Sequence, residues 1–286
     1  MVGGILAMLI AVVVLISGGR PQASDRHAVA HPTTAPTRHY AVTTTTDRER
    51  GLPALLPTAA ARLRVLEIGD SLGIDFGDQL QSQLDATGIA LTTMASLGDT
   101  GLANASYYDW PAHLVTLLGT YHPQVVVVFI GANDDQGLYV DGTAAAPGTP
   151  AWAAGYGQRV DAVVREATGA GARVVWVGMP PMANSDLNTA MQLENMICQH
   201  ETETFSGTLY VSSASVLSDA SGHYETDGVD ASGQEVALRT PDGVHLTAAG
   251  AGLLARSVIN AVDTRWHLSL EMTAAPGSTA AGQSVD

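Results

Sequence analysis

The sequence contains no lysine and a single cysteine, Cys198, in 286 residues. One thiol excludes an intrachain disulfide and is compatible with any cellular compartment. The lack of lysine, together with abundant Ala, Gly and Val, indicates a GC-rich coding sequence rather than a mechanism. Basic residues are scarce, because 13 arginines face 28 acidic residues and the formal net charge is −15. An acidic surface of this kind disfavours nucleic acid and anionic membranes as partners.

One long apolar run stands at the N-terminus, where residues 2–18 carry no charge and residues 5–16 are continuously apolar. This run is short for a spanning helix and long enough for the core of a signal peptide. No basic residue precedes it, and no cysteine follows it closely, which excludes a lipoprotein anchor. The small-residue stretch at residues 28–30 could be a cleavage site but lies far downstream. We therefore favour an uncleaved membrane anchor at residues 1–19 over a cleaved signal, and either predicts an extracytoplasmic protein, membrane-anchored or secreted.

Composition divides the rest of the chain into three parts. Residues 20–60 are rich in Thr, Pro, Ala and Arg without an apolar period, which predicts a disordered stalk. A folded domain is expected at residues 61–266, and a disordered tail at residues 267–286.

Within the folded part, short apolar strands alternate with helices. The predicted strands are residues 65–68, 89–94, 125–130, 173–177 and 208–211. The predicted helices are residues 74–86, 111–119, 152–168, 187–204 and 247–262. Strands that are apolar throughout predict a parallel sheet covered on both faces, and right-handed crossovers then give a three-layer α/β/α domain.

Three connections receive their own predictions. Residues 96–110 and 142–150 are expected to be loops. Residues 224–239 have turn residues at 230–233 between polar runs, which predicts a β-hairpin just before the last helix.

Ser71 lies where the first strand ends, in the sequence Gly69-Asp70-Ser71-Leu72. A strand-to-helix turn at the carboxyl edge of a parallel sheet exposes a hydroxyl where α/β folds place their sites. The helix amino end adds free N–H groups and a partial positive charge, so a serine there can attack a carbonyl. A second interpretation stays open at this point, in which Asp70 and Ser71 only cap the helix.

Three further turns can meet Ser71 at the same edge of the sheet. They are residues 96–99 after the second strand, residues 131–134 after the third strand and residues 241–246 before the last helix. Acyl transfer needs a nucleophile, a base, an orienter of the base and donors for an oxyanion. His245 is the only histidine beside such a turn with a carboxylate at fixed spacing, and Asp242 can reach its Nδ1 while Nε2 faces Ser71. The backbone N–H groups of Ser71 and Gly98 and the side-chain amide of Asn133 can supply oxyanion donors. Gly98 alone is typical of a turn and Asn133 alone of a loop cap, so the order of the whole set carries the prediction.

These motifs resemble the SGNH hydrolase superfamily, also called GDSL esterases, over about residues 62–262. The resemblance implies that Ser71 is the nucleophile, that Asp242 and His245 complete its triad, and that Gly98 and Asn133 are oxyanion donors. It also implies a flavodoxin-like sheet and neither metal nor cofactor. The sequence is similar to one exported or membrane-tethered bacterial branch long labelled as of unknown function, whose relatives add or remove O-acyl groups on cell-envelope sugars.

Three more residues are candidates for substrate binding: Asp70, Trp110 and Arg239. For Trp110 the alternative is packing of its loop, and for Arg239 it is a structural ion pair. Asp134 and Asp135 adjoin Asn133 and are expected to fix its loop.

The remaining histidines and the cysteine are given no chemical role. His113, His122 and His200 lack a ligand partner at useful spacing, so no metal site is assigned. Cys198 shares a helical apolar stripe with residues 193 and 197, which is typical of a core position.

Three functions are compatible with these patterns. The favoured one is a serine esterase that acts on O-acyl esters, acetyl or other short acyl groups on cell-envelope carbohydrate, through an acyl-serine intermediate. An O-acyltransferase would use the same intermediate with a sugar hydroxyl as acceptor. A catalytically silent carbohydrate-binding module has no need of the complete set of Ser71, Asn133, Asp242 and His245.

Overall fold

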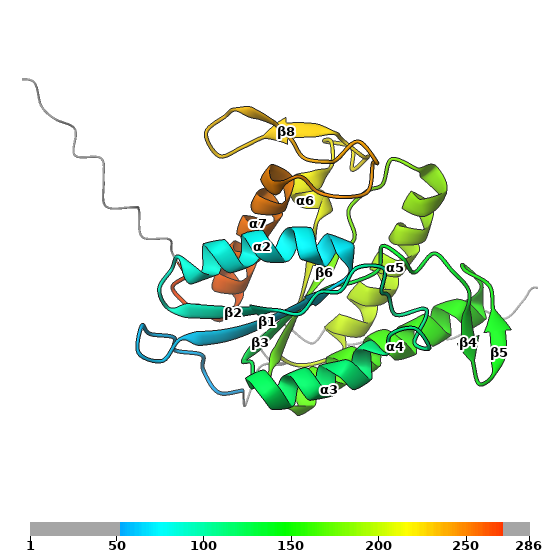
Figure 1. The fold of residues 1–286 in the computed structure, drawn as a ribbon, viewed down its shortest axis with the longest axis horizontal. Coiled ribbons are helices and arrows are strands. Elements are labelled where there is room, and N and C mark those ends of the chain that lie inside the picture. Colours follow the sequence, from blue (N-terminus) through cyan, green and yellow to red (C-terminus); the bar gives the residue numbers. More distant parts are fainter. Residues whose placement is uncertain (1–51, 271–286) are drawn as a thin grey trace, which may run out of the picture. The chain divides into compact units, whose positions relative to one another are not determined.

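The computed structural model describes residues 52–270. Their central feature is a five-stranded sheet in the order β2-β1-β3-β6-β7, in which all neighbouring strands are parallel (Figure 1). The strands are β1 (Leu63–Gly69), β2 (Ala90–Met94), β3 (Val125–Phe129), β6 (Arg173–Gly178) and β7 (Thr208–Ser212). This is the strand order of flavodoxin-like sheets, so the predicted fold class is confirmed.

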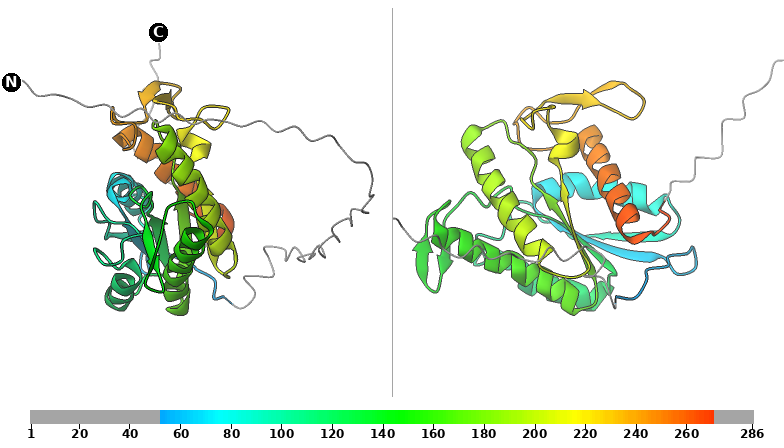
Figure 2. Two further views of the ribbon diagram at one scale, coloured as in Figure 1. Left: turned by 90° about the vertical axis from the view of Figure 1, so that its right-hand side faces the viewer. Right: turned by 180° about the vertical axis from the view of Figure 1, so that it is seen from behind.

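Helices cover both faces of the sheet (Figures 1 and 2). One face carries α2 (Ser71–Asp85) and α7 (Ala248–Trp266), and the other carries α3 (Trp110–Tyr121) and α4 (Pro150–Gly169) with α5 (Ser185–Glu203) beside α4. A single unpredicted turn, α6 (Ala214–Leu217), follows β7. The predicted sheet strands and long helices all occur, with their ends displaced by a few residues.

The β3 strand explains why the sheet is buried on both sides. All five of its residues are buried. Val125 and Val127 belong to the core under α2 and α7, whereas Val126 and Val128 belong to the core under α3 and α4. β-Branched residues suit such a doubly covered central strand.

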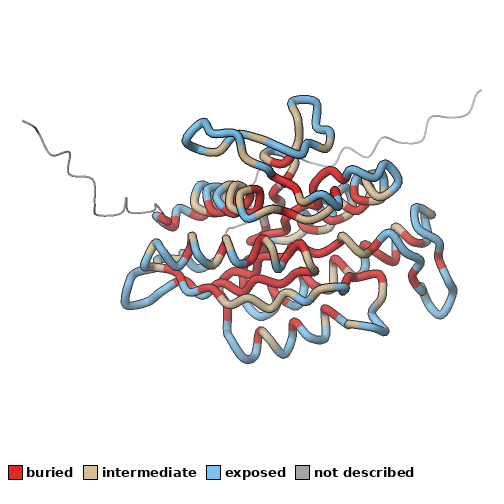
Figure 3. Tube along the Cα trace, turned by 45° about the horizontal axis from the view of Figure 1, so that its top comes forward, coloured by how far each residue is buried: buried red, intermediate tan, exposed pale blue. Residues whose placement is uncertain are grey.

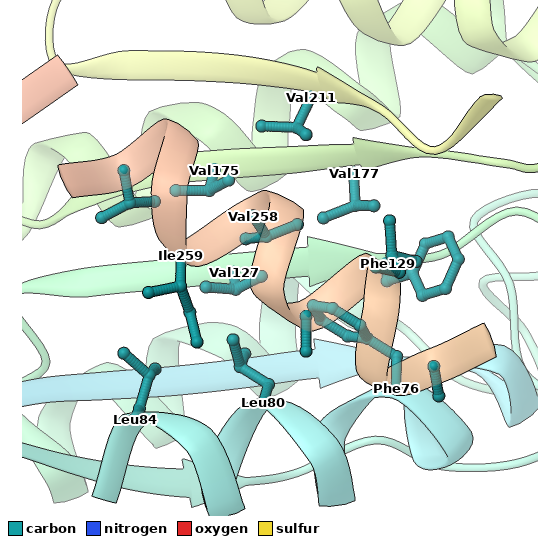
Figure 4. Close-up of a cluster of buried hydrophobic side chains, with 14 of the residues drawn as sticks. Phe76, Leu80, Leu84, Val127, Phe129, Val175, Val177, Val211, Val258 and Ile259 are labelled. Carbon is teal, nitrogen blue, oxygen red and sulfur yellow. The ribbon is translucent and has the colours of Figure 1, made fainter. Parts of the chain in front are cut away.

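The core under α2 and α7 follows helical spacing. Phe76, Leu80 and Leu84 recur at every fourth residue of α2 and point at the sheet, where Val258 of α7 meets them (Figure 4). Phe76 contacts Phe129 edge to face, with ring centroids 5.4 Å apart. This packing fixes the amino end of α2 against the end of β3, and that junction carries Ser71.

Two antiparallel hairpins lie outside the central sheet, and both are largely exposed (Figure 3). β8 (Asp227–Val229) and β9 (Glu235–Ala237) form the hairpin predicted at residues 224–239. β4 (Leu138–Val140) and β5 (Thr143–Ala145) form a second hairpin, so the prediction of a plain loop at residues 142–150 is wrong in its first part. Asp141 and Gly142 join the two strands with φ values of 48° and 78°. An Asp-Gly pair at positive φ is a strong hairpin signal that the sequence contained.

The packed chain is longer than the predicted range of 61–266. Leu55 packs against the core, and Arg173 donates a hydrogen bond to the carbonyl of Pro53 over 3.1 Å. At the other end Leu268 and Leu270 are buried. The predicted N-terminal anchor, the stalk before residue 52 and the tail after residue 270 lie outside the described residues. Within residues 52–270 no helix combines the length and the apolar character that crossing a membrane requires.

Candidate active site

Ser71 is the first residue of α2, directly after the end of β1. The helix therefore begins before the predicted residue 74. Asp70 is the N-cap, and its Oδ1 accepts the N–H of Leu72 over 2.9 Å. The Ser71 hydroxyl lies 2.9 Å from His245 Nε2 instead of capping the helix. The two interpretations of this turn thus apply to different residues, because Asp70 caps and Ser71 faces a base.

His245 and Asp242 come from the loop between β9 and α7. His245 Nδ1 lies 2.7 Å from Asp242 Oδ2. Asp242 Oδ1 accepts hydrogen bonds from the Thr240 hydroxyl and from the N–H groups of Val244 and His245, over 2.7 to 3.0 Å. The Val244 N–H is the largest influence that holds the pKa of Asp242 below its usual value. An ionised Asp242 accepts the Nδ1 proton, so Nε2 is the nitrogen left to accept the proton of Ser71.

Arg239 supports this loop from beneath. Only 2% of its surface is exposed, and its guanidinium donates to the carbonyls of Pro181 and Val244, each over 2.6 Å. The guanidinium also lies 5.1 Å from the centre of the Tyr224 ring. Neither prediction for Arg239 matches this geometry, since the side chain is buried and these partners are carbonyl oxygens and an aromatic ring. The guanidinium thus connects the loop that carries Asp242 and His245 to Pro181 in the segment after β6.

Asp70 is likewise buried and does not reach the surface as a substrate contact would. Its Oδ2 accepts the N–H groups of Gly131 and Ala132 over 2.9 and 2.8 Å. Burial raises the pKa of Asp70 to about 6, although these N–H groups and that of Leu72 act in the opposite direction. Asp70 therefore joins the turn that carries Ser71 to the loop after β3.

The loop after β3 carries Asn133, which is half-buried. Its side-chain amide donates to the carbonyl of Thr100 over 2.8 Å. Because an amide nitrogen has two hydrogens, the second remains for another acceptor. Gly98 lies in the adjacent loop after β2, and its neighbour Leu97 donates its N–H to the carbonyl of Gly69 over 2.8 Å. Within residues 52–270 the backbone N–H groups of Ser71 and Gly98 donate to no protein acceptor.

Trp110 is fully buried at the start of α3. Its Nε1 donates to the Thr100 hydroxyl over 3.1 Å. The packing interpretation of Trp110 therefore describes it better than direct contact with the acyl group, and Trp110 supports the residue that holds Asn133.

Asp134 fixes the loop after β2 rather than only its own loop. It is buried and accepts the N–H groups of Leu102 and Ala103 over 2.8 and 2.7 Å, and the Tyr156 hydroxyl over 2.9 Å. Burial raises its pKa to about 6. Asp135 is exposed. The two loops that carry Gly98 and Asn133 are thus connected through one carboxylate.

Three acidic residues near the site were missed by the sequence reasoning. Asp75, one turn after Ser71, accepts the N–H of Leu246 over 3.2 Å. Glu67 of β1 is buried, accepts the Ser96 hydroxyl over 2.6 Å, and has its pKa raised by burial to about 8. Glu194 of α5 is buried, burial raises its pKa well above the usual value, and its carboxyl oxygens have no hydrogen-bond partner among the described residues. A glutamate in the middle of an apolar strand was the signal that marked Glu67.

The residues without an assigned chemical role are dispersed. Cys198 is buried in the core under α3 and α4 with Leu193 and Ile197 packed against it, which confirms the core prediction. His113 stacks on the Tyr108 ring at a centroid distance of 3.9 Å. Over residues 52–270 no three His, Cys, Asp or Glu side chains gather around a common point that could hold a metal ion.

Residues 64–261 match the family described as "Protein of unknown function (DUF459)". No curated protein matches the sequence. Among solved structures, the chain is similar to a GDSL-like lipase from Bacteroides thetaiotaomicron, at 14% identity and a TM-score of 0.51, over 73% of this chain and 92% of that one. It is also similar to a catalytic mutant of Axe2, an acetylxylan esterase from Geobacillus stearothermophilus, at 15% identity and a TM-score of 0.51, over 70% and 94% of the two chains. At these identities the likeness establishes the fold, which is that of the SGNH hydrolases.

Proposed function

Since this chain belongs to the family described as "Protein of unknown function (DUF459)" and has the fold of SGNH hydrolases, we propose that it is a serine esterase. In this proposal Ser71 is the nucleophile, His245 the general base and Asp242 the residue that orients the base. The substrates are O-acyl esters with acetyl or other short acyl groups, borne by cell-envelope carbohydrate.

One observation carries the proposal. A continuous chain of hydrogen bonds runs from Ser71 Oγ to His245 Nε2 over 2.9 Å and from His245 Nδ1 to Asp242 over 2.7 Å. Ser71 and Asp242, at the two ends of this series of hydrogen bonds, lie near opposite ends of the folded part of the sequence. A helix cap alone does not require a histidine at the serine hydroxyl, and a silent binding module does not require an oriented base.

Acylation follows from this geometry. His245 Nε2 takes the proton of Ser71 as Oγ attacks the ester carbonyl carbon, and the carbonyl oxygen gains the negative charge of the tetrahedral intermediate. The Asp242 carboxylate stabilises the imidazolium. The imidazolium then gives its proton to the leaving alcohol oxygen, the ester C–O bond breaks, and the acyl group remains on Ser71.

Deacylation repeats these steps with water. His245 takes a proton from water, the hydroxide attacks the acyl carbon, and the proton returns to Ser71 Oγ as the carboxylic acid leaves.

The backbone N–H groups of Ser71 and Gly98 and the second amide hydrogen of Asn133 are the proposed donors to the oxyanion. One such donor typically contributes about 10²–10³ in rate.

The substrate class rests on chemistry and on likeness. One structural neighbour is an acetylxylan esterase, which acts on acetyl groups carried by a polysaccharide. The predicted export of the chain by residues 1–19 would place it among envelope glycans, and cell fractionation of the full-length protein tests that location. A protein recovered only from the cytoplasm would contradict it.

Hydrolysis of p-nitrophenyl acetate by the full-length chain tests the esterase. We expect activity that is lost in Ser71→Ala and retained in the exposed control Ser215→Ala. A fluorophosphonate should add one covalent group at Ser71, seen by peptide mass spectrometry. Labelling at another serine would overturn the assignment, and acyl transfer to an added sugar faster than hydrolysis would make the protein an O-acyltransferase.

A further inference from the structure

A cavity lined by none of the triad residues or proposed oxyanion donors has no role in the chemistry described so far. It has a volume of about 170 Å³ and lies between the loop after β2, the first turn of α3, the β4–β5 hairpin and α4. We call it the hairpin pocket and define it by Tyr108, Trp110, Tyr139, Asp141, Gln158 and Arg159. A cavity of about 150 Å³ accommodates benzene, so the hairpin pocket is large enough to receive one six-membered ring, with the substituents of a pyranose directed toward its opening.

Arg159 holds two walls of the pocket in fixed positions. Its guanidinium donates to the carbonyls of Leu102 and Ala103 in the loop after β2. It also donates to the carbonyl of Tyr139 in β4 over 3.2 Å. These three contacts tie the hairpin to the loop, so the pocket is formed before a ligand arrives.

A third wall is aromatic and rigid. The Tyr108 ring stacks on His113 at 3.9 Å and meets Trp110 edge to face at 4.8 Å between centroids. Tyr139 at the rim is 71% exposed. Tyrosine rings offer an apolar face together with a hydroxyl, which suits the mixed surface of a sugar ring.

The polar groups of the pocket are available to a ligand. No other group within residues 52–270 hydrogen-bonds to the side chains of Gln158 or Asp141, and both are exposed. An amide and a carboxylate are donors and acceptors for hydroxyl groups. The Arg159 guanidinium already donates to three backbone carbonyls. The Asp141 carboxylate repels anions. The chemistry therefore favours a neutral, hydroxyl-rich ligand over an anion or an acyl chain.

The pocket is connected to the predicted oxyanion site through one residue. Trp110 lines the pocket and donates to the Thr100 hydroxyl over 3.1 Å. The Thr100 carbonyl accepts the amide of Asn133 over 2.8 Å. The β4–β5 hairpin begins shortly after Asn133, so the pocket and the reacting centre share the carboxyl edge of the sheet.

We propose that the hairpin pocket binds a neutral sugar unit of the carbohydrate whose ester is cleaved at Ser71. This inference rests on the proposed function and specifies where the glycan is held. It predicts that recognition of the sugar and attack on the ester are separable by mutation, because the pocket residues Tyr139 and Gln158 belong to neither the triad nor the proposed oxyanion donors.

The test compares esters with and without a sugar. The substrates are p-nitrophenyl acetate, p-nitrophenyl octanoate and a panel of acetylated xylo-, cello- and chito-oligosaccharides. The enzymes are the full-length chain, the double variant Tyr139→Ala/Gln158→Ala and the control Tyr121→Ala, an exposed tyrosine at the far end of α3. Tyr139 and Gln158 are both exposed, so their truncation leaves the core intact.

We expect at least one oligosaccharide to be deacetylated, with kcat/KM in the double variant lowered about tenfold through KM, the size of losing one hydrogen bond and one ring contact. Both p-nitrophenyl esters and the Tyr121→Ala control should be unchanged. The inference is overturned if the double variant treats every oligosaccharide like the parent, if octanoate hydrolysis falls instead, or if only p-nitrophenyl acetate is a substrate.

A binding measurement separates failure of this inference from failure of the proposed function. Calorimetry with Ser71→Ala protein, which cannot turn over, should detect the oligosaccharide, and adding the double substitution should weaken binding about tenfold. Binding without hydrolysis by the parent protein would reject the esterase and keep the sugar site. Hydrolysis of p-nitrophenyl acetate with no binding of any oligosaccharide would reject the sugar site and keep the esterase.

Discussion

The buried carboxylate of Asp70 accepts the backbone N–H of Gly131 over 2.9 Å, and so joins the residue before the candidate nucleophile to the loop after β3. A second N–H, from Ala132, meets the same oxygen over 2.8 Å. The relative position of Ser71 and Asn133 thus depends on a fully buried side chain. This is a positioning contact between two neighbouring strands of the sheet.

Asp70→Asn should therefore lower both stability and activity. An asparagine keeps one oxygen, but its amide hydrogens would face the donors that Asp70 now satisfies, and a buried unsatisfied group costs about 1–3 kcal/mol. Urea unfolding measures the change. The matched control is Asp109→Asn, the exposed N-cap of α3, where Asn caps as well as Asp. Equal stability of the two variants would contradict the role given to Asp70.

Asp242→Asn should leave the fold intact and reduce kcat on the order of 10⁴, because the imidazole loses the partner that fixes its tautomer. The Val244 N–H holds the pKa of Asp242 below its usual value, so the carboxylate stays ionised through the neutral range and the difference in rate between parent and variant should persist across that range. Steady-state kinetics across pH measures both effects.

The control for that experiment is Asp230→Asn. Asp230 also accepts backbone N–H groups in a tight turn, from Ser232 and Gln234, but it lies in the β8–β9 hairpin away from His245. Its variant should keep the parent rate. Activity that EDTA abolishes and zinc restores would reject the triad mechanism.

Asn133→Ala should lower kcat by about 10²–10³ with little change in KM. The reason is that the Asn133 amide is proposed to donate a hydrogen bond to the negative charge that develops on the carbonyl oxygen only in the transition state. Initial-rate kinetics with p-nitrophenyl acetate separates the two constants. A change confined to KM would move Asn133 to substrate binding.

Glu67→Gln should stabilise the protein increasingly as the pH rises. Burial raises the pKa of Glu67 from 4.5 to about 8, so the folded state binds a proton that the unfolded state has already released in this interval. The free energy of unfolding of the parent protein therefore falls with pH across that range, and glutamine removes this contribution. Urea unfolding at several pH values should give a difference between variant and parent that grows from about pH 4.5 to 8. A difference that stays constant over this range would show that Glu67 ionises normally.

The long elements and the turns were readable from the sequence because their signals are local. The four consecutive valines predicted β3, helical spacing over about residues 74–84 predicted α2, and polar turn residues predicted the β8–β9 hairpin. The β4–β5 hairpin was overlooked although Asp141-Gly142 marked it. Its strands are as short as those of β8 and β9, so in both hairpins only the turn residues carry the signal, and residues 142–150 were assigned as one loop.

The sequence by itself determined which residue types stand at the carboxyl edge of the sheet. Parallel strands that all end at one edge bring their following turns together, which is why Ser71, Asn133 and His245 could be grouped before any coordinates. Only the tertiary structure decided what the residues around Ser71, Asn133 and His245 contact. Arg239 was expected at the substrate or in an ion pair, and it bonds instead to the carbonyl of Pro181, 58 residues away. Burial and hydrogen-bond partners at such separations depend on packing, and no local pattern encodes them.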